Sequence, residues 1–172
     1  PTLSGQWLLT GHPEDAVAAA EATKAGWYRR ATPFSARVQQ KLNNLVDDLF
    51  TYAWVDGVLF QDDLYLNDYE DFSSAAKTAY AEAFGRQLTP DIRDDAIRRA
   101  EWTAWKTRSI NQLTADLTKT IRYRRPDALV LRNIYAMPVL KPYSEDWYAQ
   151  RYDDYLQHYD YTVIMAYPYM EK

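Results

Sequence analysis

Helical periodicity alternates with short apolar runs along this chain, and this alternation constrains the fold more than any other feature. Residues 38–50 repeat apolar side chains at spacings of three and four, as an amphipathic helix does. Residues 55–60 then form a short run of β-branched and other apolar residues, and similar runs occur at residues 128–131 and 161–166. Buried strands separated by helices predict an α/β fold, in which helices cover a parallel sheet.

Local signals place the ends of several expected helices. Ser35 is positioned to cap the helix over residues 38–50. A helix over residues 73–84 is closed by Gly85. A longer helical stretch is expected from Pro90 through residues 122–125, where Pro126 stops it, and a further helix over residues 147–156.

The N-terminal part carries weaker signals. Residues 3–10 are apolar enough for a strand. Pro13, followed by acidic residues and alanines, is typical of a helix start, so we expect a helix over residues 14–22 that ends near Gly26.

Polar residues follow each expected strand. Asp62 and Asp63 follow the first strand, and Arg132 and Asn133 come at the end of the second. Glu171 follows the third. The carboxyl ends of parallel strands carry the active site in (β/α) barrels and the ligand in open α/β sheets. We therefore expect the functional site at this end of the sheet.

Composition excludes several classes of function. The net charge is −4 and there is no basic run, which argues against a nucleic-acid partner. The chain has no cysteine and only two histidines, far apart in sequence, so neither a disulfide scaffold nor a thiolate or histidine metal site is expected. We predict no metal or other cofactor. No apolar stretch is long enough for a membrane span.

The chain is rich in aromatic residues, with 15 Tyr and 6 Trp. Tyr and Trp combine an apolar face with a polar group, which suits the apolar C–H faces and polar rims of sugar rings. Most of these side chains are expected in the core, including Trp102 and Trp105. The tyrosines near strand ends are candidate platforms for sugars: Tyr65, Tyr135, Tyr167 and Tyr169.

Several motifs resemble, in the expected order, the barrel of the bacterial poly-β-1,6-N-acetyl-D-glucosamine N-deacetylase family. They are residues 56–63 (DGVLFQDD), 67–71 (NDYED), 105–108 (WKTR), 132–139 (RNIYAMPV) and 166–171 (AYPYME). The resemblance implies a (β/α), TIM-barrel-like fold. It also implies that residues 1–172 are part of a single glycan-hydrolase barrel, incomplete because both ends look cut from a longer chain. The family's N-terminal metal-dependent deacetylase domain is not among these residues.

The resemblance also implies a function. The corresponding domain is expected to bind partly de-N-acetylated poly-β-1,6-N-acetylglucosamine, a biofilm polymer, and to cut it internally as a glycoside hydrolase. The parent protein is expected in the periplasm, associated with the outer membrane, with an export porin as a partner. Two alternatives remain: a non-catalytic module that guides the polymer to export, and a half-barrel without activity.

Glycoside hydrolysis usually requires two carboxyl groups that flank the scissile bond. The candidate catalytic residues are Asp62, Asp63 and Glu171. The candidate substrate-binding residues are Asp68, Tyr65, Arg132, Asn133, Tyr135, Tyr167 and Tyr169. Adjacent aspartates on an extended segment point to opposite sides, so one of the pair with Asp68 or Glu171 is the better combination unless the chain turns sharply.

Each candidate also has a structural interpretation. Asp62 and Asp63 can form a turn or cap a helix, and Asp68 can cap a helix that begins near Tyr69. Arg132 can form an internal ion pair. Lys106 and Arg108 lie on an expected helix, where a solvated face or a pair with Glu101 is the simpler reading.

Overall fold

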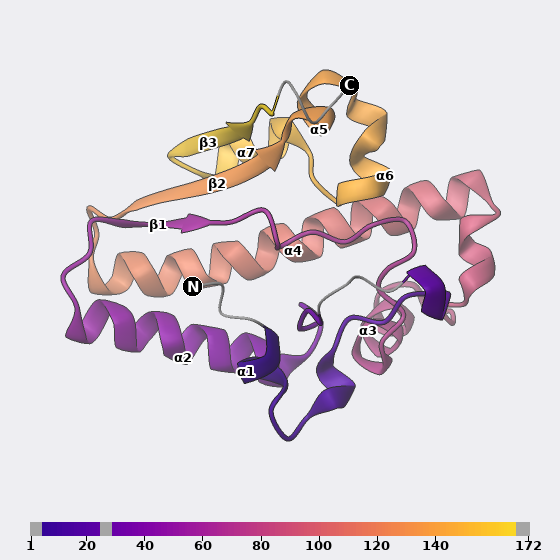
Figure 1. Ribbon diagram of the computed structural model, residues 1–172, viewed down its shortest axis with the longest axis horizontal. Coiled ribbons are helices and arrows are strands. Elements are labelled where there is room, and N and C mark those ends of the chain that lie inside the picture. Colours follow the sequence, from indigo (N-terminus) through magenta and orange to yellow (C-terminus); the bar gives the residue numbers. More distant parts are fainter. Residues whose placement is uncertain (1–4, 25–28, 168–172) are drawn as a thin grey trace.

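Three parallel strands form the sheet of the computed structural model, which describes residues 5–24 and 29–167 (Figure 1). The strands are β1 (Gly57–Phe60), β2 (Leu129–Tyr135) and β3 (Tyr161–Met165), in the order β1-β2-β3. Phe60 pairs with Arg132, and Tyr135 pairs with Met165. Both strand pairs are parallel, which confirms the predicted strand–helix alternation and brings the residues after β1 beside the end of β2.

Seven α-helices accompany the sheet within the described residues. They are α1 (Gly5–Leu9), α2 (Ala36–Tyr52), α3 (Ser74–Phe84), α4 (Ala96–Arg124), α5 (Ala136–Leu140), α6 (Glu145–Tyr148) and α7 (Tyr152–His158). Short 3-10 turns cover Pro13–Asp15, Ala22–Lys24, Pro90–Arg93 and Pro142–Ser144. The two longest helices, α2 and α4, lie side by side along the sheet (Figure 1).

The predicted helix ends are confirmed at three positions. The Ser35 hydroxyl accepts a hydrogen bond from the Val38 amide at the start of α2. The Ser73 hydroxyl accepts a hydrogen bond from the Ala76 amide at the start of α3. Gly85 ends α3 with φ +65°, a conformation that glycine adopts without steric cost. The stretch expected from residue 90 instead begins with a 3-10 turn. Asp95, whose carboxylate accepts from the amides of Ile97 and Arg98, caps α4.

The main core lies between the sheet and the helices. Val130 and Ile134 of β2 pack with Phe50 of α2, Ile121 of α4 and Tyr155 of α7. A second core cluster contains Trp102 and Trp105, which confirms the prediction that both tryptophans are buried.

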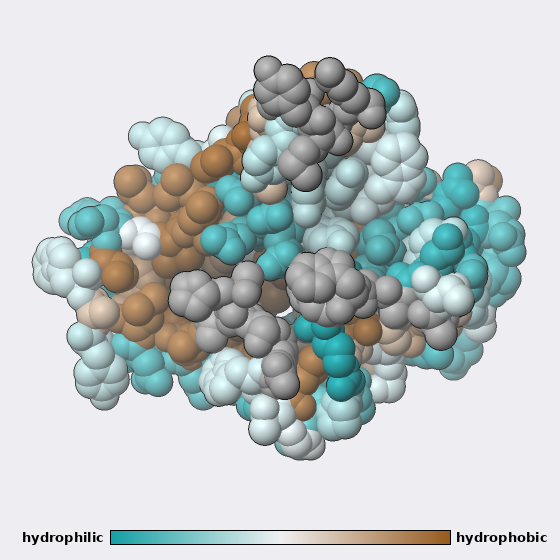
Figure 2. All heavy atoms as spheres, in the orientation of Figure 1, coloured by the Kyte–Doolittle hydropathy of each residue, from teal (hydrophilic) through white to brown (hydrophobic). Residues whose placement is uncertain are grey.

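The opposite face of the sheet is apolar and partly exposed. Leu59, Leu129 and Val163 are 41%, 45% and 38% exposed, and Figure 2 shows hydrophobic side chains gathered over the strands. In a closed barrel this face would be packed by side chains of other strands. The described strands form an open sheet, with helices over one face only.

The expectations for the N-terminal part are wrong. Residues 5–9 form α1 rather than a strand. The helix expected over residues 14–22 is reduced to a 3-10 turn, after which the chain is extended. This extended segment pairs with the loop after β1: Ala20 donates to the Tyr69 carbonyl, and Phe72 donates to the Ala18 carbonyl. Tertiary hydrogen bonds thus override the high helix propensity of alanine. The expected end at Gly26 lies outside the described residues.

The helix expected over residues 147–156 is divided into α6 and α7. Ala149 is fully buried and adopts φ +48° between them. The next residue, Gln150, accepts a hydrogen bond from the Tyr135 amide with its side-chain oxygen. The break therefore ties the α6–α7 connection to the end of β2.

Gly57 is required at the start of β1 because the neighbouring strand approaches closely. A Cβ at this position would lie 2.3 Å from the Leu129 carbonyl oxygen. Gly57→Ala is expected to lower the free energy of unfolding by about 1–3 kcal/mol, as overpacking does elsewhere. Urea unfolding measures the effect, and an unchanged midpoint would contradict it.

Candidate active site

The residues that follow β1 make a sharp turn. The Leu64 amide donates to the Gln61 carbonyl at 3.5 Å, so the chain reverses at Asp62 and Asp63. The Tyr135 hydroxyl donates to Asp62 at 3.3 Å. The negative charges of both aspartates act on Tyr135. Adjacent aspartates can face the same region where the chain turns sharply, and the chain does turn sharply at Asp62 and Asp63.

Three tyrosines surround this turn. The ring centroids of Tyr135 and Tyr148 lie 4.6 Å apart, and Tyr65 lies 5.9 Å from Tyr135 and 6.4 Å from Tyr148. Tyr65 and Tyr135 were predicted at the site, whereas Tyr148 of α6 was not. Aromatic rings beside carboxylates offer both a stacking surface and hydrogen-bond acceptors.

The Tyr135 phenol remains neutral beside the acids. Burial raises the pKa of Tyr135, and the negative charge of Asp62 raises it further. The phenol is therefore a hydrogen-bond donor to Asp62 across the ordinary pH range.

Three cations from different parts of the chain hold the loop that carries the acids. Arg132 of β2 donates to the Leu64 carbonyl, and Arg30 donates to the Tyr65 carbonyl. Lys106 of α4 donates to the carbonyls of Asn67 and Glu70 at 2.6 and 2.8 Å. The conformation of this loop thus depends on contacts made by residues outside it.

Arg132 lies under the loop, fully buried. Its Nε donates to the Tyr155 hydroxyl at 3.2 Å, and its guanidinium lies over the Tyr155 ring, 5.5 Å from the centroid. Among the described residues it forms no ion pair, and its Nη1 atom has no hydrogen-bond partner. Its neighbour Asn133 alternates to the other side of β2, and the Asn133 Oδ1 atom is likewise buried without a partner in the described part of the chain.

Asp68 lies in a turn instead of capping a helix. The Glu70 amide donates to the Asn67 carbonyl at 3.2 Å, and the Tyr69 amide donates to Asn67 Oδ1 at 2.8 Å. The next helix, α3, begins only at Ser74. The interpretation of Asp68 as the cap of a helix near Tyr69 is therefore wrong.

Lys106 is buried, so the expectation of a solvated lysine or a pair with Glu101 is also wrong. Glu101 pairs with Arg86 instead. The Lys106 ammonium lies 3.7 Å from the Trp102 ring centroid, and Asp68 contributes most among the carboxylates that act on it. Asp68 is thus electrostatically coupled to Lys106.

The remaining predicted residues follow β3 in the sequence. Tyr167 follows the strand and is 48% exposed. Tyr169 and Glu171 lie outside the described residues. Over residues 5–24 and 29–167, no group of three or more His, Asp or Glu side chains is arranged to hold a metal ion. No helix in the same ranges is long and apolar enough to cross a membrane.

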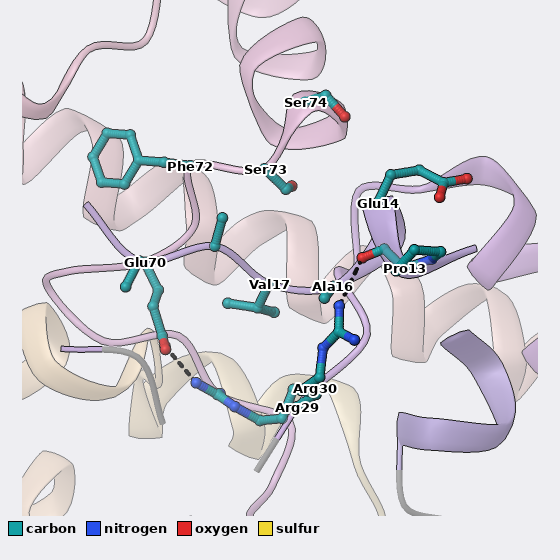
Figure 3. A pocket seen from close by; sticks show the side chains of 12 residues that line it. Pro13, Glu14, Ala16, Val17, Arg29, Arg30, Glu70, Phe72, Ser73 and Ser74 are labelled. Atoms are coloured by element: carbon teal, nitrogen blue, oxygen red, sulfur yellow. Dashed lines mark hydrogen bonds and ion pairs between the residues drawn. The ribbon is translucent and has the colours of Figure 1, made fainter. Parts of the chain in front are cut away.

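A cavity of about 490 Å³ lies where the N-terminal segment pairs with the loop after β1 (Figure 3). Arg29, Arg30, Glu70 and Ser73 are among its lining residues, and none of the predicted site residues that the structure describes lines it. Arg30 forms an ion pair with Glu70 and also lies over the Tyr65 ring, 4.2 Å from the centroid. The cavity and the tyrosine cluster therefore lie on either side of Arg30.

Comparison with known proteins identifies the family. The family model described as hypothetical glycosyl hydrolase family 13 matches residues 8–172. This chain belongs to that family. Two poly-beta-1,6-N-acetyl-D-glucosamine N-deacetylases, from Escherichia coli strains K12 and O157:H7, are each 41% identical over 145 residues. The alignment covers 84% of this chain and 22% of each relative.

A solved structure extends the family assignment to the fold. The glycoside hydrolase domain of PgaB (BpsB) from Bordetella bronchiseptica superposes with a TM-score of 0.81 at 34% sequence identity. The match covers 91% of this chain and 46% of that structure. The fold of this chain is therefore TIM-barrel-like with an unclosed sheet. The family resemblance that the motifs predict is confirmed.

Proposed function

We propose that this chain acts as a glycoside hydrolase on partly de-N-acetylated poly-β-1,6-N-acetylglucosamine. The observation that carries the proposal is the turn at the end of β1, which brings Asp62 and Asp63 beside Tyr135. The family match supports a glycosidase, and the names of the E. coli relatives support this polymer.

The chemistry requires one carboxyl group that is protonated and one that is charged. Crowded carboxylates push each other's pKa apart, which produces these two states. We assign the acid role to one of Asp62 and Asp63. Glu171 stays a predicted partner, from its position after the third strand and from the motif at residues 166–171.

The tyrosines supply the binding surface in this proposal. Tyr65, Tyr135 and Tyr148 present aromatic rings on which the C–H faces of sugars can stack. The amine of a deacetylated sugar is a cation, which nearby aspartates attract. Internal cleavage of the polymer is proposed from the resemblance to the family.

A second candidate is a non-catalytic binding module that guides the polymer to export. The observation that favours it is the charge interaction of Asp68 with the buried cation Lys106, which argues against Asp68 as a second catalytic acid. In this case Asp62 and Asp63 would bind amines without cutting the chain.

Incubation with partly deacetylated polymer separates the two candidates. The hydrolase proposal predicts bound polymer and shorter oligosaccharides, read by mass spectrometry. Polymer that binds but keeps its length would favour the guiding module.

We propose, by the same resemblance, that the parent protein works in the periplasm at the outer membrane and passes polymer to an export porin. Cell fractionation tests the location, and co-purification with outer-membrane proteins tests the partner.

A further inference from the structure

Lys106 is a fully buried cation that contacts the acidic loop. It has 0% exposure, although lysine is among the residues least often buried completely. Eighteen residues separate it from Arg124 at the end of α4, a distance of about 27 Å along a helix. The end of α4 leads into the start of β2, and the helix runs back along the sheet. A residue about 27 Å before the end of α4 therefore lies at the level of the carboxyl ends of the strands.

The ammonium group bridges both ends of one turn. Its hydrogen bonds reach the carbonyls of Asn67 and Glu70, which flank Asp68 and Tyr69. The turn is also closed from within by the Asn67 side chain and by the Glu70 amide. Loss of the ammonium group would leave two carbonyls without their donor in a buried setting, which destabilises the turn.

The charges around Lys106 come from two elements. Asp68, Glu70 and Asp71 belong to the loop after β1, and Asp146 belongs to α6. Glu70 already pairs with Arg30, and Asp71 accepts four hydrogen bonds from Ala18, Thr32 and Ser73. Asp146 pairs with Arg99. Among the described residues Asp68 makes no hydrogen bond or ion pair of its own, and of these four carboxylates it interacts most strongly with the charge of Lys106.

We propose that Lys106 is a positioning residue, which pins the Asn67–Glu70 turn so that Asp68 recognises the amine of a deacetylated sugar. This inference rests on the proposed function, because it takes Asp68 as part of the polymer site. It assigns selectivity for deacetylated units to a residue that does not touch the polymer.

Hydrogen exchange tests the positioning role without any substrate. Lys106→Met is expected to speed exchange at the amides of Tyr69 and Glu70 by about tenfold or more. Lys119→Met is the matched control, because Lys119 is an exposed lysine on the same helix. Unchanged exchange in the turn, or equal acceleration along the whole chain, would overturn the proposal.

Binding measurements test the selectivity. The probes are a partly deacetylated β-1,6-linked oligosaccharide and its fully N-acetylated counterpart. Lys106→Met and Asp68→Asn should each reduce the preference for the deacetylated probe about fivefold or more, and the double variant should lose no more than either single variant. Additive losses would overturn the proposal.

If Lys106→Met fails to fold, Asp68→Asn alone decides, since an unchanged preference would contradict the role of Asp68. Failure of the unaltered protein to bind either probe would count against the proposed function, while the exchange result still decides the role of Lys106.

Discussion

Replacing Asp62 with asparagine is expected to lower the rate of polymer cleavage by about 10²–10⁴-fold, the range typical for loss of a general acid or base. Asparagine keeps the shape of the side chain and can still interact with the Tyr135 hydroxyl, but it can neither donate a proton to the leaving oxygen nor carry a charge. Binding of the polymer should stay within a few-fold of the unaltered protein, because the tyrosine cluster is unchanged. Rates of oligosaccharide release and a separate binding isotherm measure the two effects.

The matched control for this variant is Asp116→Asn. Asp116 is an exposed aspartate on α4 whose contacts are with Lys119 and Gln112. Its replacement should leave cleavage unchanged. Asp63→Asn belongs in the same series, since loss of cleavage in only one of the two variants identifies which of these carboxyl groups the reaction requires. Full activity in both Asp62→Asn and Asp63→Asn would sink the catalytic assignment of this turn.

The stability of the protein should rise with pH because of Lys106. Burial lowers the pKa of Lys106 from 10.5 to about 7, although Asp68 and other carboxylates oppose the effect. Between these two values the unfolded chain binds more protons at this site than the folded chain does, so the free energy of unfolding increases with pH. Since one pKa unit corresponds to about 1.4 kcal/mol, the gain from about pH 7 to about pH 9.5 is about 3 kcal/mol.

Lys106→Met isolates this contribution because methionine has no titratable group. The difference in free energy of unfolding between the unaltered protein and the variant should grow with pH over this window, as measured by urea unfolding at several pH values. Lys119→Met, at an exposed position, should give a difference that does not change with pH. A pH-independent difference for Lys106→Met would mean that the buried amine keeps its ordinary pKa.

The sheet could be predicted from the sequence because its strands are short apolar runs between helices. Short apolar runs such as residues 55–60 are typical of strands in a parallel sheet covered by helices, although the open face of this sheet leaves Leu59 41% exposed. The position of Asp62 and Asp63 follows from the strand that precedes them, and the structure brings them beside Tyr135 of the next strand. These features depend on local pattern and on the rule that parallel strands end together.

The parts that could not be predicted depend on tertiary contacts. Residues 14–22 have the composition of a helix, but their amides are taken by Asp71 and by the loop after β1. Tyr148 reaches the site from the last position of α6, directly before the break at Ala149, and local pattern does not predict this break. Lys106 did carry a signal: it lies four residues after Trp102 and four before Ile110, on the apolar stripe of α4. A lysine on such a stripe indicates a buried partner.

A crystal structure of the Asp62→Asn variant with a partly deacetylated β-1,6-glucosamine oligosaccharide would test the central claim most directly. We predict sugar rings stacked against Tyr65, Tyr135 and Tyr148, with a glycosidic oxygen within hydrogen-bond distance of residue 62 or residue 63. Oligosaccharide bound elsewhere, such as in the cavity beside Arg29, with the tyrosine cluster empty, would contradict the assignment of this end of the sheet as the polymer site.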